Sequence, residues 1–169
     1  MAAPGIAAQG APKHEFGVDL SMASVKAEGS SESLFALRTP VDVRIGFVSA
    51  SAVMLETRFG LAYVSGGGDS QLSFVPGLNA LVRLGSGSGP HNLMGAYLTG
   101  GASAQMARVS SSGTTNTQTR FAVNVGLGTR IAWGDAAIRP EAFFSQMLKK
   151  DNLPAITSLG LRLGVSFWH

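Results

Sequence analysis

The C-terminal stretch of this chain alternates strictly between two kinds of residue. Between residues 159 and 167, the odd positions carry Leu, Leu, Leu, Val and Phe, and the even positions carry Gly, Arg, Gly and Ser. Because successive side chains of a β-strand point to opposite faces, such a strand has one apolar face and one small or charged face. A barrel in water turns its apolar face inward, and a barrel in a membrane turns it outward. The choice between these orientations decides the fold and the location.

The composition favours the membrane. Charged residues make up only 14% of the 169 residues and the mean hydropathy is +0.21, whereas soluble domains carry about 25% charged residues. No apolar run reaches the roughly 18 residues of a transmembrane helix. High apolarity without such a run is typical of strands that face lipid. The net charge of +3 is spread along the chain and Cys is absent, so a nucleic-acid partner and a thiolate metal site are not indicated.

Alternating segments recur along the chain, separated by Gly, Ser, Pro and Asp. Eight segments follow this pattern: 14–26, 41–48, 53–64, 71–84, 92–107, 119–133, 136–148 and 156–168. They run from 8 to 16 residues, and a tilted transmembrane strand needs about 9–11. The sequence therefore predicts an all-β fold, an eight-stranded antiparallel up-and-down transmembrane β-barrel. Residues 14–169 would form this single domain, preceded by a flexible segment at 1–13 that is either mature protein or the end of a signal peptide.

The connections and the aromatic residues predict how the barrel sits in the membrane. The polar connections at 27–40, 65–70, 108–118 and 149–155 are mostly longer than the others and are expected outside, with both termini in the periplasm. Aromatic residues on the apolar face gather at two levels, as the two membrane interfaces favour. The periplasmic girdle would be Phe16, Phe47, Trp133 and Phe167, and the outer girdle Tyr63, Phe74, Phe121 and Phe144.

The opposite face carries charges of both signs among Gly, Ala and Ser. Its charged positions are Glu15, Asp19, Asp42, Arg44, Glu56, Arg58, Arg83, Arg120, Arg130, Arg139, Glu141 and Arg162. Arginine forks pair well with carboxylates in confined spaces, and small residues suit a narrow interior. We therefore expect a lumen packed with ion pairs. The alternative is a soluble lipocalin-like barrel whose apolar side chains fill the interior.

In this pattern the chain resembles the small eight-stranded outer-membrane barrels, of the type of outer membrane protein A's membrane domain and outer membrane protein X. The strand from Leu159 to Trp168 resembles the assembly signal of that family, whose members usually end in Phe or Trp; here His169 follows. The resemblance implies a place in the bacterial outer membrane, among lipids and lipopolysaccharide, and assembly by the barrel-assembly machinery. It implies fold more than function.

The sequence offers little catalytic chemistry. The three histidines, His14, His91 and His169, lie at segment ends or termini, and none has metal-ligand spacing to acidic residues. We expect no enzyme, no cofactor and no metal, and a structural or surface-interaction role through the outer loops. A small-solute or ion pore and a lipid-remodelling enzyme remain alternatives.

Three further expectations concern particular positions. Four cations near the outer rim could contact lipopolysaccharide phosphates: Arg38, Arg108, Lys149 and Lys150. Pro76 and Pro140 fall inside expected strands and should weaken the ladder or form a bulge. The Ala- and Gly-rich face of the segment at 92–107 could be a contact for a protein partner or a second copy.

Overall fold

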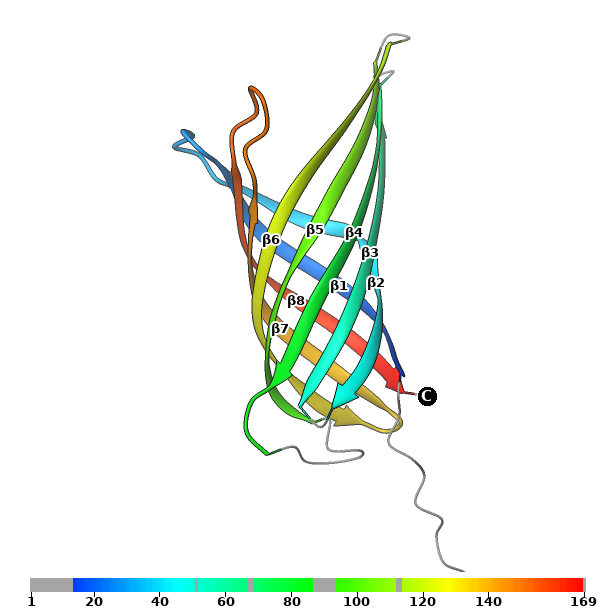
Figure 1. The fold of residues 1–169 in the computed structure, drawn as a ribbon. Coiled ribbons are helices and arrows are strands. Elements are labelled where there is room, and N and C mark those ends of the chain that lie inside the picture. The colour runs from blue at the N-terminus through cyan, green and yellow to red at the C-terminus, as the bar shows by residue number, and fades with distance from the viewer. Residues whose placement is uncertain (1–13, 51, 67–68, 87–93, 112–113, 169) are drawn as a thin grey trace, which may run out of the picture.

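The computed structural model is a closed antiparallel barrel whose eight strands pair in chain order, β1 to β8, with β1 closing against β8 (Figure 1). The expected fold class is confirmed. The structure describes residues 14–50, 52–66, 69–86, 94–111 and 114–168, and their side chains except at 35–41, 49–50, 62–66, 69 and 111. The strands are β1 (His14–Ala27), β2 (Leu34–Ala50), β3 (Val53–Gly66), β4 (Asp69–Arg83), β5 (Gly95–Ser111), β6 (Thr114–Trp133), β7 (Ala136–Met147) and β8 (Ile156–Trp168).

The second strand begins seven residues earlier than the alternation indicated, at Leu34 and not at Val41. The register between β1 and β2 explains the difference. Asp19 faces Asp42, but Ser21 faces Arg38, so β2 carries two more residues than β1 across this step. Pro40 lies inside this irregularity, where a missing backbone donor is tolerated. The expected loop at 27–40 is therefore wrong, and the connection is only 28–33.

The strands β5 and β6 also run further than expected. Their ladder continues without a break from Gly95 and Arg130 to Ser111 and Thr114, so most of the connection expected at 108–118 is hairpin. Alternation of apolar and polar residues is lost there because both faces of the hairpin meet water. The Thr-rich sequence nevertheless suits a strand.

Beyond the barrel wall, β3, β4, β5 and β6 continue together as a four-stranded sheet. The ladder of β3 with β2 stops at Phe59, and that of β6 with β7 stops at Ala122. By contrast, β3 with β4, β4 with β5 and β5 with β6 stay paired almost to their turns. This sheet, which we call the outer extension, rises above the rest of the barrel, away from the end that holds the C-terminus (Figure 1).

The expectation that the outer connections are the longer ones is wrong for two of the four. The connections at that end are 28–33, 67–68, 112–113 and 148–155, while β4 and β5, at the other end, are joined by 84–94. The extra length at the outer end lies in strands and not in loops.

Both prolines within the wall weaken the ladder, as expected. The ladder of β4 with β5 omits Val75 and Pro76 between its pairs at Phe74 and Gly77. That of β6 with β7 omits Pro140 together with Arg139. No register shift occurs at either place, so each proline removes ladder bonds without forming a bulge.

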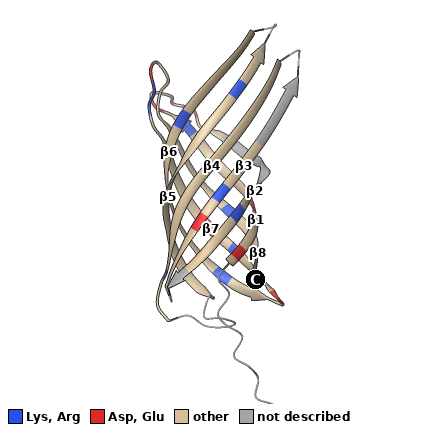
Figure 2. Cartoon of the chain, turned by 45° about the vertical axis from the view of Figure 1, so that its right-hand side comes forward, with Lys and Arg blue, Asp and Glu red and all other residues tan. Residues whose placement is uncertain are grey.

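The side chains separate cleanly into two faces. Large apolar side chains point outward, with Phe16, Leu161 and Phe121 being 49%, 59% and 61% exposed. Charged positions on the strands are sparse (Figure 2), and those at Glu15, Arg44 and Glu56 are buried inside. Water cannot solvate such an exterior favourably, whereas hydrocarbon can. The soluble-barrel alternative is therefore wrong. No helix within the described ranges could span a membrane.

Candidate functional site

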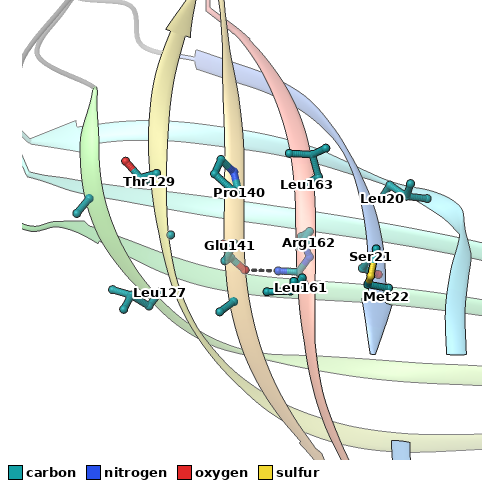
Figure 3. Close-up of a pocket in the computed structure, with 13 residues that line it drawn as sticks. Leu20, Ser21, Met22, Leu127, Thr129, Pro140, Glu141, Leu161, Arg162 and Leu163 are labelled. Atoms are coloured by element: carbon teal, nitrogen blue, oxygen red, sulfur yellow. Dashed lines mark hydrogen bonds and ion pairs between the residues drawn. The ribbon is translucent and has the colours of Figure 1, made fainter. Parts of the chain in front are cut away.

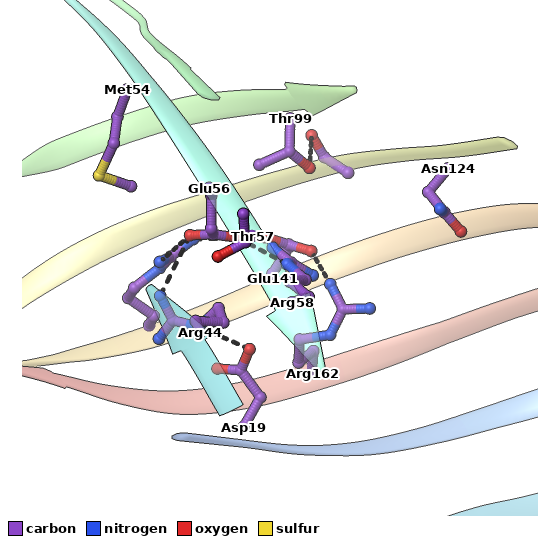
Figure 4. Close-up of polar contacts among 12 residues, drawn as sticks. Asp19, Arg44, Met54, Glu56, Thr57, Arg58, Thr99, Asn124, Glu141 and Arg162 are labelled. Carbon is purple, nitrogen blue, oxygen red and sulfur yellow. Dashed lines mark hydrogen bonds and ion pairs between the residues drawn. The ribbon is translucent and has the colours of Figure 1, made fainter. Parts of the chain in front are cut away.

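The interior of the barrel holds a dense network of charged side chains, part of which is drawn in Figure 4. Among the described residues, ten ion pairs join five arginines to four carboxylates. The arginines are Arg44, Arg58, Arg130, Arg139 and Arg162, and the carboxylates are Glu15, Asp19, Glu56 and Glu141. They come from every strand except β4 and β5, because the inward parity of each strand carries a charge at this level.

Glu15, on β1, lies at the centre of the network. Its Oε1 accepts from Arg44 at 3.0 Å, Arg139 at 2.8 Å and Ser166 at 2.7 Å. Its Oε2 accepts from Arg130 at 2.6 Å and from the indole of Trp168 at 3.3 Å. These donors replace the water that the buried carboxylate has lost.

Three further carboxylates, those of Glu56, Glu141 and Asp19, extend the network. Glu56 accepts from Arg44 at 3.2 Å, Arg139 at 2.8 Å and Arg58 at 2.5 Å. Glu141 accepts from Arg58 at 3.4 Å and from Arg162. Asp19 pairs with Nε of Arg44 at 2.6 Å. The shared arginines make one connected unit, in which removing one member leaves others without a counter-charge.

Tyr97 packs within this network and was missed as a site residue in the sequence. Its hydroxyl lies 3.2 Å from Glu141, and the guanidinium groups of Arg139 and Arg130 lie 4.9 and 5.4 Å from its ring centroid. Its cross-strand neighbour is Gly128, where an added Cβ would lie 2.5 Å from the ring. Gly128 therefore provides the space for the ring. The inward parity of Tyr97 was the only sequence signal for this role.

Apolar side chains pack beside the network inside the barrel. Met54, Leu81 and Tyr97 form one buried cluster, against which Val48 packs. Met94 and Ala137 form a second, against which Val48 and Trp168 pack. Ions crossing the barrel would have to pass both the paired charges and these clusters.

The other charged residues expected inside have different surroundings. Asp42 and Arg83 are half-buried at inward positions, and a Cβ added at Gly60 would meet the Asp42 carboxylate at 2.5 Å. Arg120 is buried but lies apart from the network. It donates to the carbonyls of Leu148 at 3.1 Å and Pro154 at 2.6 Å, and thereby braces the connection between β7 and β8.

The cations expected at the outer rim are only partly described. Arg108, Lys149 and Lys150 are exposed, and Nζ of Lys150 donates to the Thr119 carbonyl at 2.8 Å. Arg38 faces Ser21 in the ladder, and its side chain lies outside the described set. The contacts of these four residues with lipopolysaccharide stay a prediction.

The aromatic residues expected at the membrane interfaces point outward where they are described. The exposed rings are those of Phe16, Phe47, Trp133 and Phe167 at one level, and Phe74, Phe121 and Phe144 at the other. The side chain of Tyr63 lies outside the described set. Their position at the interfaces stays a prediction.

The histidines and acidic residues offer no metal centre in the part of the chain that is described. His14 is exposed, with its ring edge-on to Phe47 at 5.4 Å between centroids. His91 and His169 fall outside the described residues.

Comparison with solved structures bears directly on the fold. Neisserial surface protein A superposes with a TM-score of 0.71, over 95% of this chain and 100% of that one, at 16% identity. The attachment invasion locus protein Ail of Yersinia pestis gives 0.55, over 92% and 99%, at 12% identity. The N-terminal β-barrel domain of Pseudomonas aeruginosa OprF gives 0.54, over 90% and 97%, at 16% identity.

This chain has the fold of the small eight-stranded outer-membrane barrels. No protein-family model matches its sequence, and no curated protein matches it either. The likeness thus lies in the architecture. Together with the apolar exterior described above, this architecture places the protein in the bacterial outer membrane.

Proposed function

We propose that this outer-membrane barrel is a non-enzymatic surface-interaction protein, which presents its outer extension and outer connections to partners outside the cell. The observation that carries this proposal is the four-stranded sheet that continues past the membrane-embedded wall. Strands add no stability to the embedded part once they have left it, so their ordered continuation supports a role for the surface that they display.

The surface of the outer extension suits contacts in water. Its tip on β5 and β6 is polar, with exposed side chains at Arg108, Thr115 and Asn116. Ser110 and Thr115 hydrogen-bond across the hairpin at 3.1 Å. A rigid, polar hairpin loses little conformational entropy on binding, which favours its use as a recognition surface.

The side chains inside the lumen favour a structural role for the barrel over a role as a pore. The paired charges and the apolar clusters beside them occupy the path that a solute would take. In an eight-stranded barrel, side chains fill the interior. We infer that the ion pairs hold the strands together and fix the shape of the platform from which the extension rises.

We also propose the partners that follow from the location. These are outer-membrane lipids and lipopolysaccharide along the wall, with Arg38, Arg108, Lys149 and Lys150 near lipid phosphates, and the barrel-assembly machinery during biogenesis. The face of β5 that carries Ala96, Gly100 and Ala102 remains a proposed contact for a protein partner or a second copy.

A shortened variant tests the proposed function. Met106 faces Thr119, and Tyr63 faces Leu72, in the ladders. Replacing residues 107–118 and 64–71 with Asn-Gly turns therefore removes the outermost part of the outer extension while keeping the register. Bacteria carrying the full-length protein should adhere to cultured epithelial cells and to heparin-coated beads more than bacteria carrying the shortened barrel. The beads are included because Ail has been solved with the heparin analogue sucrose octasulfate. Equal adhesion to both surfaces, at equal surface amounts, would contradict the proposal.

A further inference from the structure

The outward face of β6, β7, β8 and β1 carries an apolar groove of about 620 Å³ (Figure 3). Pro140 and Ala142 of β7 form its shallow floor, between Leu127 on β6 and the pair Leu161 and Leu163 on β8. The leucines are 55–59% exposed and form its sides. Behind this wall, in the lumen, lies the ion pair of Glu141 with Arg162.

Register explains why the wall is hollow at this point. Ala142 faces Leu161, which faces Met22, and Pro140 faces Leu163, which faces Leu20. In the first row Ala142 is the small side chain, between Leu127 and Leu161. In the second row Pro140, Thr129 and Ala96 are all short, and all three line the groove. The side chains of Ala142 and Pro140 are too short to fill the space between their neighbours, so the depression follows from the sequence itself.

A polar row crosses the same strands nearer the outer end. Gln146 faces Thr157, which faces Lys26. All three have the parity of the outward-facing leucines, and Lys26 is exposed. The Thr157 hydroxyl donates to Oε1 of Gln146 at 2.8 Å, which holds these two side chains together. The nearest carboxylate along β1, that of Glu28, accepts from the Ala155 amide at 3.4 Å.

The spacing of the groove and the polar row matches one lipid leaflet. Pro140 lies six residues from Gln146 along β7, which is about 20 Å along a strand and about 14 Å along the membrane normal for a tilt near 45°. Half of a hydrocarbon core is about 15 Å thick. A lipid with its headgroup at the polar row therefore has its chain end at the groove.

We propose that this face is a binding site for one acylated lipid of the outer leaflet with a net negative, phosphorylated headgroup, with a headgroup phosphate on Lys26 and an acyl chain in the groove over Ala142 and Pro140. Thr157 and Gln146 would offer hydrogen bonds to headgroup hydroxyls. A cation placed above an apolar groove is complementary to an anionic amphiphile and to no neutral partner of similar shape. This inference deepens the proposed function and rests on it, because it gives the lipid partner of the wall a particular site; it does not involve the outer extension.

Lipid binding to the refolded protein in detergent tests the proposal. Native mass spectrometry would follow titration with bisphosphorylated lipid A and, separately, with phosphatidylcholine. The variants are Lys26→Gln, which removes the cation, and Ala142→Phe, which fills the groove. Ala80→Phe is the matched control, because Ala80 also points outward but lies on β4, on another part of the wall. Heat-dependent migration in gels would show that each variant is folded.

We expect one lipid A to bind wild-type protein and the Ala80→Phe control at least about tenfold more tightly than phosphatidylcholine. Lys26→Gln and Ala142→Phe should each weaken lipid A binding by about tenfold, as loss of one charge-assisted or well-packed contact predicts. The proposal is overturned if the two phenylalanine variants behave alike, if Lys26→Gln binds as wild type, or if Ala142→Cys forms disulfide-linked dimers, since a second copy would then occupy the groove. Adhesion by the outer extension would be unaffected by any of these outcomes.

Discussion

Glu15 is the residue on which the interior of this barrel most depends. Replacing it with Gln removes the charge shared by Arg44, Arg130 and Arg139 while keeping the size of the side chain. Because these arginines are buried, loss of a partner should lower the free energy of unfolding by about 3–5 kcal/mol. Urea unfolding in lipid vesicles, followed by tryptophan fluorescence, measures the change. Glu32→Gln, at an exposed position, should change stability by less than about 0.5 kcal/mol.

A second residue-scale prediction concerns the space beside Tyr97. Gly128→Ala places a methyl group 2.5 Å from the ring, so the ring must move and disturb its arginine neighbours. We expect a loss of about 1–3 kcal/mol, the usual range for overpacking. Gly100→Ala is the matched control on β5, since a Cβ there has no atom within 4 Å. If both variants unfold at the same urea concentration, Tyr97 is not confined as described.

Parity alone places most of the interior charges from the sequence. It puts Glu15, Glu56 and Arg139 inside, because alternation is strict within the membrane. It does not show that Arg120 binds backbone carbonyls while Arg139 binds carboxylates, since that depends on how far along the barrel each one lies. The sequence did not predict that Tyr97 and Trp168 belong to the interior network, because aromatic rings are not expected on an inward face that otherwise carries polar residues.

At the scale of elements, Arg120 holds the connection between β7 and β8. Arg120→Ala removes its hydrogen bonds to the carbonyls of Leu148 and Pro154, and local opening of the connection should increase by about tenfold. Trypsin added to protein in bilayers should then cleave after Lys149 or Lys150 about tenfold faster. Arg108→Ala, on the exposed part of β5, serves as control. Unchanged cleavage would show that other contacts hold this connection.

The limits of the strands were harder to predict than their existence. Apolar and polar residues alternate only where one face of a strand meets lipid. The pattern therefore indicates the embedded part of β5 and β6 and is lost where both faces meet water. Pro40 is the last residue of the connection expected at 27–40, yet it lies in a register irregularity of β2 that only pairing with β1 can create. The residues at 108–118 have the composition of a turn, yet most of them form a hairpin of β5 and β6 that pairing with β4 stabilises.

For the whole molecule, the apolar wall determines how the protein must be handled. The purified protein should be monodisperse in detergent micelles or nanodiscs. It should aggregate when detergent is removed, because exposing its apolar outer side chains to water is unfavourable. Sedimentation velocity measures this directly. A stable monomer in detergent-free buffer would mean that the outward faces described here are wrong.

The filled lumen gives a second prediction at this scale. In planar bilayers the inserted protein should show no conductance steps above the baseline, because paired arginines and the cluster around Met54 and Leu81 obstruct the path. A large porin in the same bilayers is the control for insertion and detection. Regular current steps from the purified barrel would revive the pore alternative.

The partners of Glu15 also couple the two ends of the polypeptide. Its hydrogen bonds to Ser166 and Trp168 cross the seam where the first strand meets the last. A sheet that lacks its last strand is open, and Glu15 in it lacks two of its hydrogen-bond donors. Closure of the barrel and completion of the buried network are therefore a single event, which a chain without β8 cannot reach.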